Sequence, residues 1–192
     1  MVDISKLNVN HCPACGPDVT LDLSQGQRVL EHLGAHILHD PKVERLVERC
    51  GLCLRPSPIC EYYLKKGKGA RASTKIDQGK SRGCTTKLNF SYGVAAESTS
   101  SSPCSNVPRC CPLCPKSSPA IWRYSFKSHF QNTHNNADLS KYAYLWELSN
   151  FEVTEMKKIW GKRFIVSVKR PKRSTLPPLV VSDAHRSRIP ST

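Results

Sequence analysis

The sequence lacks any apolar run long enough to cross a membrane, because nothing in it approaches about 18 consecutive apolar residues. Its first residues contain no apolar stretch of the kind found in secretory signals, and Asp3 stands where such signals carry positive charge. These absences argue against a membrane-embedded or secreted protein and predict an intracellular one. In a reducing compartment, paired cysteines more often hold metal than form disulfides.

Acidic residues are also scarce, with 15 Asp and Glu against 29 Lys and Arg in 192 residues. The imbalance is uneven, since residues 1–50 carry 5 basic and 7 acidic residues whereas residues 51–192 carry 24 and 8. A basic excess of this size favours a polyanionic partner, of which nucleic acid is the commonest. The alternative is a solvated surface combined with a nuclear import signal.

Sequence motifs for catalysis are missing as well. There is no phosphate-binding glycine loop ending in Gly-Lys-Ser or Gly-Lys-Thr, and the paired halves of the zinc-deaminase signature are absent. Glu31-His32 followed by His36 has the wrong order for a metalloprotease helix, which needs His-Glu-x-x-His. The sequence therefore predicts a protein that is not an enzyme.

What the chain does contain is 10 Cys and 7 His, and two Cys-Pro-x-Cys knuckles each lead into a histidine pair at helical spacing. Two thiolates and two imidazoles suit the tetrahedral coordination of Zn²⁺. Histidines at this spacing project from one face of a helix toward the knuckle. The two predicted sites are Cys12, Cys15, His32 and His36, and Cys111, Cys114, His129 and His134.

In these residues the chain resembles the CCHH (two-cysteine, two-histidine) zinc-finger family. The resemblance also includes an apolar residue three positions before the first histidine, Val29 and Phe126, and it implies a small ββα unit with a structural zinc at each site. Cys110 competes with Cys111 as a ligand because its spacing to Cys114 is also acceptable. The knuckles are also similar to thioredoxin-like active-site pairs, but the prolines that follow them oppose the helix which that chemistry needs.

A third metal site is possible between the two fingers, in a region that contains four more cysteines. Four thiolates would close a structural zinc site, and His39, Cys104 or Cys110 are alternatives for the fourth ligand. The competing interpretation is a set of free or buried thiols. We therefore expect two Zn²⁺ ions, with a third held by Cys50, Cys53, Cys60 and Cys84.

Periodicity and capping residues predict the local structure. A helix is expected over 24–39 with Ser24 as its N-cap, a second over 41–50, a strand over 87–92, and helices over 138–148 and 149–162. Ser149 and Glu152 form a capping box for the last of these helices. Tyr142, Leu145 and Trp146 are expected to be core residues.

The expected fold class is a set of small α+β zinc-stabilised modules: two ββα-type fingers flanking a four-Cys zinc module, then C-terminal helices and a basic disordered tail. The Cys and His residues extend through most of the chain, which favours several small modules over one large core. The expected divisions are finger 1 (1–39), a helix plus the four-Cys module (40–97), a Ser-rich linker (98–103), finger 2 (104–137), two helices (138–163) and the tail (164–192).

The family resemblance also implies base-reading positions on each finger helix. Finger 1 offers Gln25, Arg28 and Glu31, which can read adenine, guanine and cytosine respectively. Finger 2 offers the poorer set Trp122, Ser125 and Ser128, and the fingers are too far apart in the chain to be a tandem array. The residues expected to contact phosphates are Lys65, Lys66, Lys68 and Arg71, and Lys169, Arg170, Lys172 and Arg173.

Together these features predict a zinc-binding nuclear protein that binds nucleic acid, DNA more than RNA, in a regulatory role. Lys157-Lys158 with the 169–173 cluster fits a bipartite signal, so the nuclear import machinery is an expected partner and a membrane is not. The alternative is a zinc-scaffolded adaptor that binds a protein through the C-terminal helices, with Tyr142, Trp146, Met156 and Trp160 as its contact face.

Overall fold

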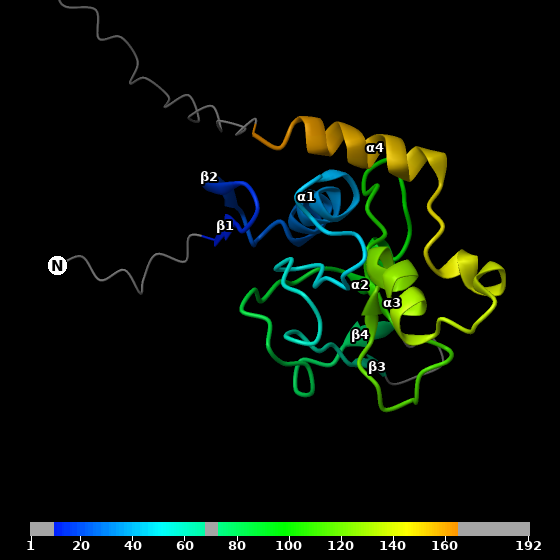
Figure 1. The fold of residues 1–192 in the computed structure, drawn as a ribbon. Coiled ribbons are helices and arrows are strands. Elements are labelled where there is room, and N and C mark those ends of the chain that lie inside the picture. Colours follow the sequence, from blue (N-terminus) through cyan, green and yellow to red (C-terminus); the bar gives the residue numbers. More distant parts are fainter. Residues whose placement is uncertain (1–9, 68–72, 165–192) are drawn as a thin grey trace, which may run out of the picture.

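The computed structural model describes residues 10–67 and 73–164, and it shows a small α+β protein (Figure 1). Its strands form three separate two-stranded antiparallel sheets, β1–β2, β3–β4 and β5–β6. Among the described residues, no helix is long and apolar enough to span a membrane. The strands are β1 (Asn10–Cys12), β2 (Gly16–Leu21), β3 (Leu64–Lys66), β4 (Thr74–Ile76), β5 (Pro108–Arg109) and β6 (Ile121–Trp122). The helices are α1 (Gly26–His39), α2 (Tyr92–Ala95), η2 (Arg123–Ser125), α3 (Phe126–Thr133), η3 (Leu139–Leu145) and α4 (Asn150–Gly161).

Both expected fingers have the order strand, strand, helix. In the first, the knuckle turns between β1 and β2, and Gly16 takes the left-handed conformation (φ +87°) that a side chain would disfavour. Helix α1 begins at Gly26 rather than after Ser24, whose hydroxyl and amide both donate to the Asp22 carboxylate instead of capping the helix. It ends where Asp40 turns to an extended conformation ahead of Pro41.

The helix expected over 41–50 does not form. These residues make turns, and Leu46 is 61% exposed. Their backbone is instead bound by side chains of the second ββα unit: Ser125 Oγ accepts from the Arg49 amide at 3.0 Å, and Asn132 Nδ2 donates to the Leu46 carbonyl at 2.9 Å. Tertiary hydrogen bonds therefore replace the local helix.

Two further elements differ from expectation. Residues 87–91 form no helix or strand, and Tyr92 begins the short helix α2, so the expected strand over 87–92 is wrong. The segment after α3 is the 3₁₀ helix η3 rather than an α-helix. Helix α4 is confirmed, with Ser149 Oγ accepting from the Glu152 amide at 3.1 Å. Glu152 does not complete a capping box, because its carboxylate is directed into the core.

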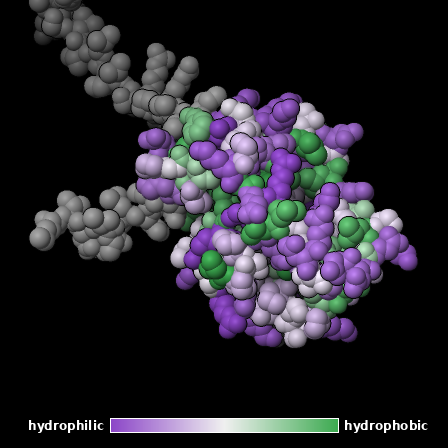
Figure 2. Space-filling view, viewed as in Figure 1, coloured by the Kyte–Doolittle hydropathy of each residue, from purple (hydrophilic) through white to green (hydrophobic). Residues whose placement is uncertain are grey.

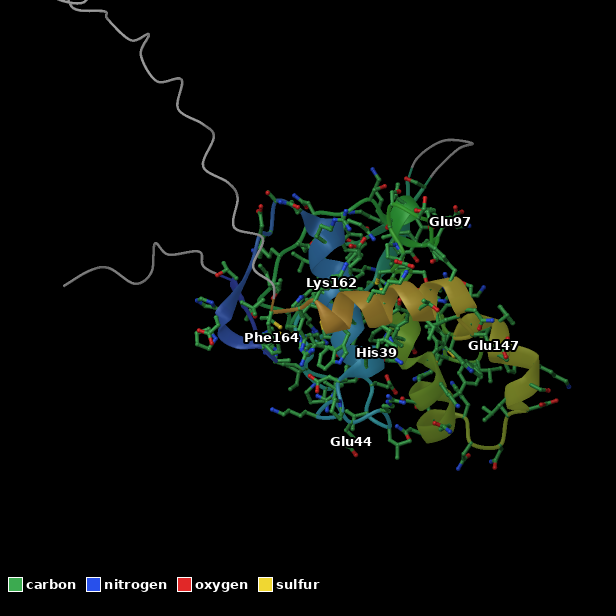
Figure 3. The ribbon with its side chains drawn as sticks, turned by 90° about the horizontal axis from the view of Figure 1, so that it is seen from above. His39, Glu44, Glu97, Glu147, Lys162 and Phe164 are labelled. Atoms are coloured by element: carbon green, nitrogen blue, oxygen red, sulfur yellow. The ribbon has the colours of Figure 1, made fainter. Side chains whose placement is uncertain are left out.

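The core is shared across the chain instead of being divided between modules. One buried cluster includes Leu30 and Leu33 of α1, Cys50, Trp122 of β6 and Met156 of α4. Figure 3 shows α4 lying across α1, and the two helices pack against each other. Within the described part of the chain, one buried cluster therefore spans several of the expected modules.

The Ser-rich stretch at 98–103 is half-buried or exposed over its first four residues, 98–101. The chain then becomes buried from residue 102 to residue 108, with Ser105 and Val107 fully enclosed. This segment runs between α1 and α4, where Glu152 Oε1 accepts from the Ser105 amide at 2.8 Å and from the Tyr124 hydroxyl at 2.5 Å. Only the end of the expected linker, residues 102 and 103, is thus buried with this segment.

A second, smaller cluster forms around α3. Phe126 and Phe130 are completely buried, and Tyr142 and Trp146 pack on Phe130 with ring centroids 5.0 and 5.3 Å away. The expectation that Tyr142, Leu145 and Trp146 are core residues is confirmed. Figure 2 shows the remaining surface as mostly hydrophilic on the face drawn, with small separate apolar patches.

Candidate metal centres

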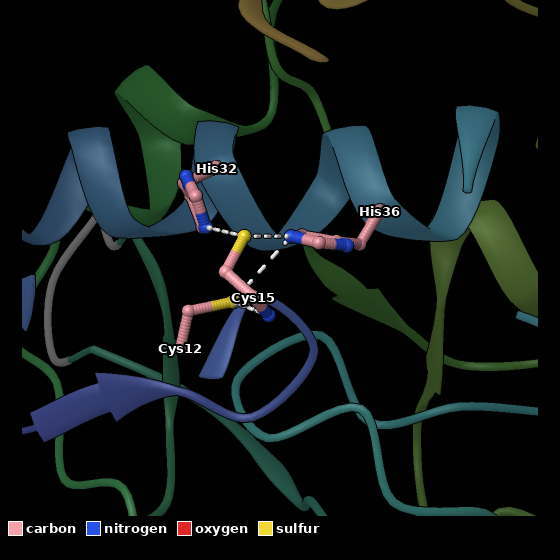
Figure 4. Close-up of side chains that lie close together, drawn as sticks. All are labelled: Cys12, Cys15, His32 and His36. Carbon is pink, nitrogen blue, oxygen red and sulfur yellow. Dashed lines mark hydrogen bonds between the residues drawn. The ribbon is translucent and has the colours of Figure 1, made fainter. Parts of the chain in front are cut away.

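The first group of donors lies between the β1–β2 knuckle and the face of α1 that carries the histidines (Figure 4). Cys15 Sγ is 3.6 Å from His32 Nε2 and 3.1 Å from His36 Nε2, and Cys12 Sγ is 3.4 Å from His36 Nε2. A tetrahedral metal with ordinary Zn–S and Zn–N bond lengths separates a sulfur from a nitrogen by about 3.5 Å. The four side chains are therefore spaced as ligands of one ion.

The thiols of this first cluster are unequal. Burial would raise the pKa of Cys12, but hydrogen bonds from His32 and His36 lower it to about 5. Burial and the neighbouring charge of Cys12 raise the pKa of Cys15 to about 12. The cluster thus holds one thiolate readily at neutral pH, and metal binding must release the proton of the second thiol.

A buried carboxylate orients one imidazole of the first cluster. His36 Nδ1 donates to Asp40 at 2.8 Å, while its Nε2 is directed toward the sulfurs. Asp40 is only 5% exposed, and although burial acts in the opposite direction, His36 lowers its pKa. A carboxylate behind a histidine fixes the tautomer and raises the basicity of a ligating nitrogen. Asp40 was not anticipated from the sequence, although its position four residues after a ligand histidine was the available signal.

The second group repeats this arrangement between the β5–β6 knuckle and α3. Cys114 Sγ is 3.3 Å from His129 Nε2 and 3.2 Å from His134 Nε2, and Cys111 Sγ is 3.5 Å from His134 Nε2. His129 Nδ1 donates to a carboxylate from a distant part of the chain, Glu48, at 3.0 Å. Cys111 lies in this cluster, whereas its competitor Cys110 is exposed and lies outside it.

The third group consists of Cys50, Cys53, Cys60 and Cys84. The sulfurs of Cys50 and Cys84 are 3.8 Å apart and those of Cys53 and Cys60 are 3.4 Å apart, near the roughly 3.8 Å edge of a tetrahedral four-thiolate site. The structure therefore gathers Cys84 as the fourth donor.

The three alternatives for that fourth donor lie elsewhere. Cys104 is 1% exposed in the core, where burial raises its pKa to about 12 and its thiol donates to the Leu30 carbonyl. His39 and Cys110 belong to none of the three donor groups found among the described residues.

Two neighbours of the third cluster were not anticipated from the sequence. Arg55 donates from Nε to Cys53 Sγ at 3.3 Å and from Nη2 to Cys60 Sγ at 3.6 Å. The Tyr62 hydroxyl lies 3.2 Å from Cys50 Sγ. Four thiolates around a divalent ion leave two excess negative charges, so a guanidinium and a hydroxyl at the sulfurs are favourable partners.

The expected base readers of α1 are poorly placed for a DNA groove. Glu31 is 2% exposed and pairs with Arg28 at 2.8 Å, so it cannot reach a base, and its assignment as a base reader is wrong. Gln25 Nε2 donates to Asp22 at 2.9 Å, whereas Arg28 remains exposed. Trp122 of the second unit is buried and packs edge-on against Tyr62 with ring centroids 5.0 Å apart.

The expected phosphate contacts divide between described and undescribed parts of the chain. Lys65 and Lys66 are exposed on β3, and Lys65 Nζ lies 3.3 Å from Asp77. The others lie outside the described residues: Lys68, Arg71, Lys169, Arg170, Lys172 and Arg173. Sequence reasoning missed four further exposed basic residues that follow in the same region, namely Lys75, Lys80, Arg82 and Lys87.

Comparison of the chain with protein-family models, with curated proteins and with solved structures finds no match. The CCHH resemblance therefore rests on the two Cys₂His₂ clusters and their strand–strand–helix frames. The fold and the sites define a small α+β protein with three four-donor clusters, each able to hold a metal ion and each consistent with zinc.

Proposed function

We propose that the chain is a domain held together by three structural zinc ions. The observation that carries this proposal is that three separate groups of four Cys or His donors have their ligand atoms within 4.8 Å of one another. Tetrahedral sites of two thiolates and two imidazoles, or of four thiolates, suit Zn²⁺. Four protein donors fill the coordination shell and leave no position for a substrate, which supports a structural ion and a protein that is not an enzyme.

Native mass spectrometry of the purified chain tests this proposal. The expected result is three zinc ions per molecule of the wild-type protein. Each of three single variants, Cys12→Ser, Cys84→Ser and Cys114→Ser, should carry one ion fewer. A folded protein that carries no metal would contradict it.

We further propose that the protein binds nucleic acid in the nucleus, DNA in preference to RNA and in a regulatory role. The support is the basic hairpin, which we define as residues 61–67 and 73–87 around β3 and β4. Its only carboxylates are those of Glu61 and Asp77, which pair with Arg82 at 2.7 Å and Lys65 at 3.3 Å. Its exposed basic side chains are Lys65, Lys66, Lys75, Lys80, Arg82 and Lys87.

A matched pair of triple variants tests the role of this hairpin. Lys65→Gln/Lys66→Gln/Lys75→Gln removes three of its charges, and Lys116→Gln/Lys127→Gln/Lys141→Gln removes three exposed charges elsewhere. Binding to duplex DNA and to RNA of equal length is measured by fluorescence anisotropy at several salt concentrations. Each lost phosphate contact reduces the salt slope on duplex DNA by about 0.9, so the hairpin variant should lose about 2 to 3 and the control less than 1. Equal losses in both variants would mean that only net charge matters.

Because Glu31 is buried, we expect this binding to be largely independent of sequence. Selection from randomised duplex DNA at about 0.15 M salt should then enrich no strong motif. An enriched motif that is lost in Arg28→Gln would instead show that α1 reads bases, since Arg28 is its exposed candidate.

Nuclear location is proposed from the two basic clusters. Lys157 and Lys158 are exposed on α4, and the partner cluster at 169–173 lies outside the described residues. A fluorescent fusion should lose nuclear accumulation when Lys169, Arg170, Lys172 and Arg173 are replaced by Gln. The adaptor alternative loses its expected contact face. Met156 is fully buried, and Tyr142, Trp146 and Trp160 pack against the two buried hydrophobic clusters of the fold.

A further inference from the structure

The second and third clusters share a short piece of chain. Glu48, whose carboxylate accepts from His129 Nδ1 at 3.0 Å, stands two residues before Cys50, a donor of the third cluster. Glu48 and His129 are 81 positions apart in the sequence, so this contact exists only in the folded chain. The same segment therefore positions the His129 imidazole of the second cluster and leads directly into Cys50, a donor of the third cluster.

Helix α3 and its preceding turn hold the rest of this segment. Ser125 Oγ accepts from the Arg49 amide at 3.0 Å and donates to the Arg49 carbonyl at 3.2 Å, and Asn132 donates to the Leu46 carbonyl at 2.9 Å. Ser128 Oγ donates to the Arg45 carbonyl. These bonds fix the backbone that enters Cys50 to the helix that carries His129.

A second connection passes through Tyr62. Its hydroxyl is 3.2 Å from Cys50 Sγ, its ring packs against Trp122, and its carbonyl accepts from the Ala120 amide at 2.7 Å. Gly51 packs closely against the same indole, because a Cβ added at this glycine would come within 2.3 Å of the Trp122 ring. The third cluster is thus bound to the second unit on two sides.

We propose that Glu48 is a positioning residue for both metals, so that the second and third clusters load cooperatively. An ion on His129 Nε2 favours the imidazole whose Nδ1–H donates to Glu48, and this contact orders the segment that places Cys50. Linkage is reciprocal, so an ion at the third cluster strengthens binding at the second. The first cluster has its own carboxylate, Asp40, at the end of its own helix and lies outside this coupling.

The inference rests on the proposed metal occupancy, and the test separates the two. The zinc-loaded chain is exposed to increasing chelator and pulsed with N-ethylmaleimide, and peptide mapping then reports which cysteines have become reactive, because metal-bound thiolates resist alkylation. In the wild-type protein, Cys111 and Cys114 should lose protection together with the third-cluster cysteines.

Three variants test the inference: Glu48→Ala, its conservative counterpart Glu48→Gln, and the control Glu44→Gln on the same segment. Loss of a carboxylate behind a ligand histidine typically weakens metal binding by about 10- to 100-fold. Glu48→Ala should therefore shift the release of both the second and third clusters to lower chelator by about that factor and leave Cys12 and Cys15 unchanged. Glu48→Gln should fall between, because its amide oxygen still accepts from His129, and Glu44→Gln, which is exposed, should match the wild type.

The outcomes that overturn the inference are distinct from failure of the metal proposal. A shift confined to Cys111 and Cys114, or no shift at all in Glu48→Ala, would show that the clusters are independent. A shift of all three clusters would show general destabilisation in place of a specific link. Absence of zinc-dependent protection in the wild-type chain would overturn the metal proposal itself and the coupling with it.

Discussion

Glu152 should be the most sensitive polar side chain outside the metal clusters. It is 1% exposed, and its carboxylate accepts from the Ser105 amide at 2.8 Å and from the hydroxyls of Ser105 and Tyr124 at 2.5 Å each. Arg123 Nη1 lies 3.7 Å from its other oxygen. One carboxylate thus joins α4 to the buried segment at 102–108 and to the turn before α3.

These contacts determine how much the Glu152→Ala substitution should lower the free energy of unfolding. Hydrogen bonds to a charged group contribute about 1.5–3 kcal/mol each, and removing one partner leaves the remaining buried donors unsatisfied. Breaking a buried ion pair from one side costs about 3–5 kcal/mol. We expect the free energy of unfolding to fall by about 4 kcal/mol, a large share of the total for a small domain.

Urea unfolding of the zinc-loaded protein, followed by tryptophan fluorescence, measures this change. Tyr124→Phe removes a single hydroxyl from the network and should cost about 1.5 kcal/mol. The control Glu155→Gln removes a half-buried partner of the exposed Lys158 and should cost no more than about 0.5 kcal/mol. A loss below about 1 kcal/mol in Glu152→Ala would refute the argument that this carboxylate fastens α4 to the core.

Three further outcomes follow from the structure. Asp40→Asn should weaken metal retention by Cys12 and Cys15 by about tenfold, measured by their alkylation under chelator, because His36 loses its charged acceptor. Gly51→Ala should destabilise the protein by about 1–3 kcal/mol in urea, because the new methyl overlaps the Trp122 ring; an unchanged midpoint would contradict the packing. Excess chelator should abolish most of the far-ultraviolet circular dichroism, and zinc should restore it, because metal binding supplies much of the folding free energy of small zinc-bound units.

The two groups of two cysteines and two histidines were predictable because their spacing in the sequence is characteristic. A knuckle followed by two histidines near one helix end suits a single ion, and the structure gathers both sets, with His134 at the C-cap of α3. Asp40 acts within the same helix end and was open to the same reasoning. The role of Glu48 could not be predicted in this way, because its contact with His129 joins residues 81 positions apart.

The failed expectations share a physical cause, which is long-range packing. The residues at 41–49 have helical periodicity, yet side chains of α3 and its preceding turn take up their backbone groups and hold them in turns. Glu31 was assigned to the outside of a free recognition helix, but residues 102–108 and α4 enclose α1.

The packing of α4 on α1 also determines when this protein can fold during synthesis. The two helices, Gly26–His39 and Asn150–Gly161, stand near opposite ends of the described chain, and Met156 fills the space beside Gly34. Until the ribosome has released α4, one apolar side of α1 has no cover, and contacts between segments so distant in sequence form slowly. If zinc binds as we propose, early capture by Cys12, Cys15, His32 and His36 would hold the nascent helix in shape during that interval. The first cluster would then stabilise the growing chain before α4 is available to cover α1.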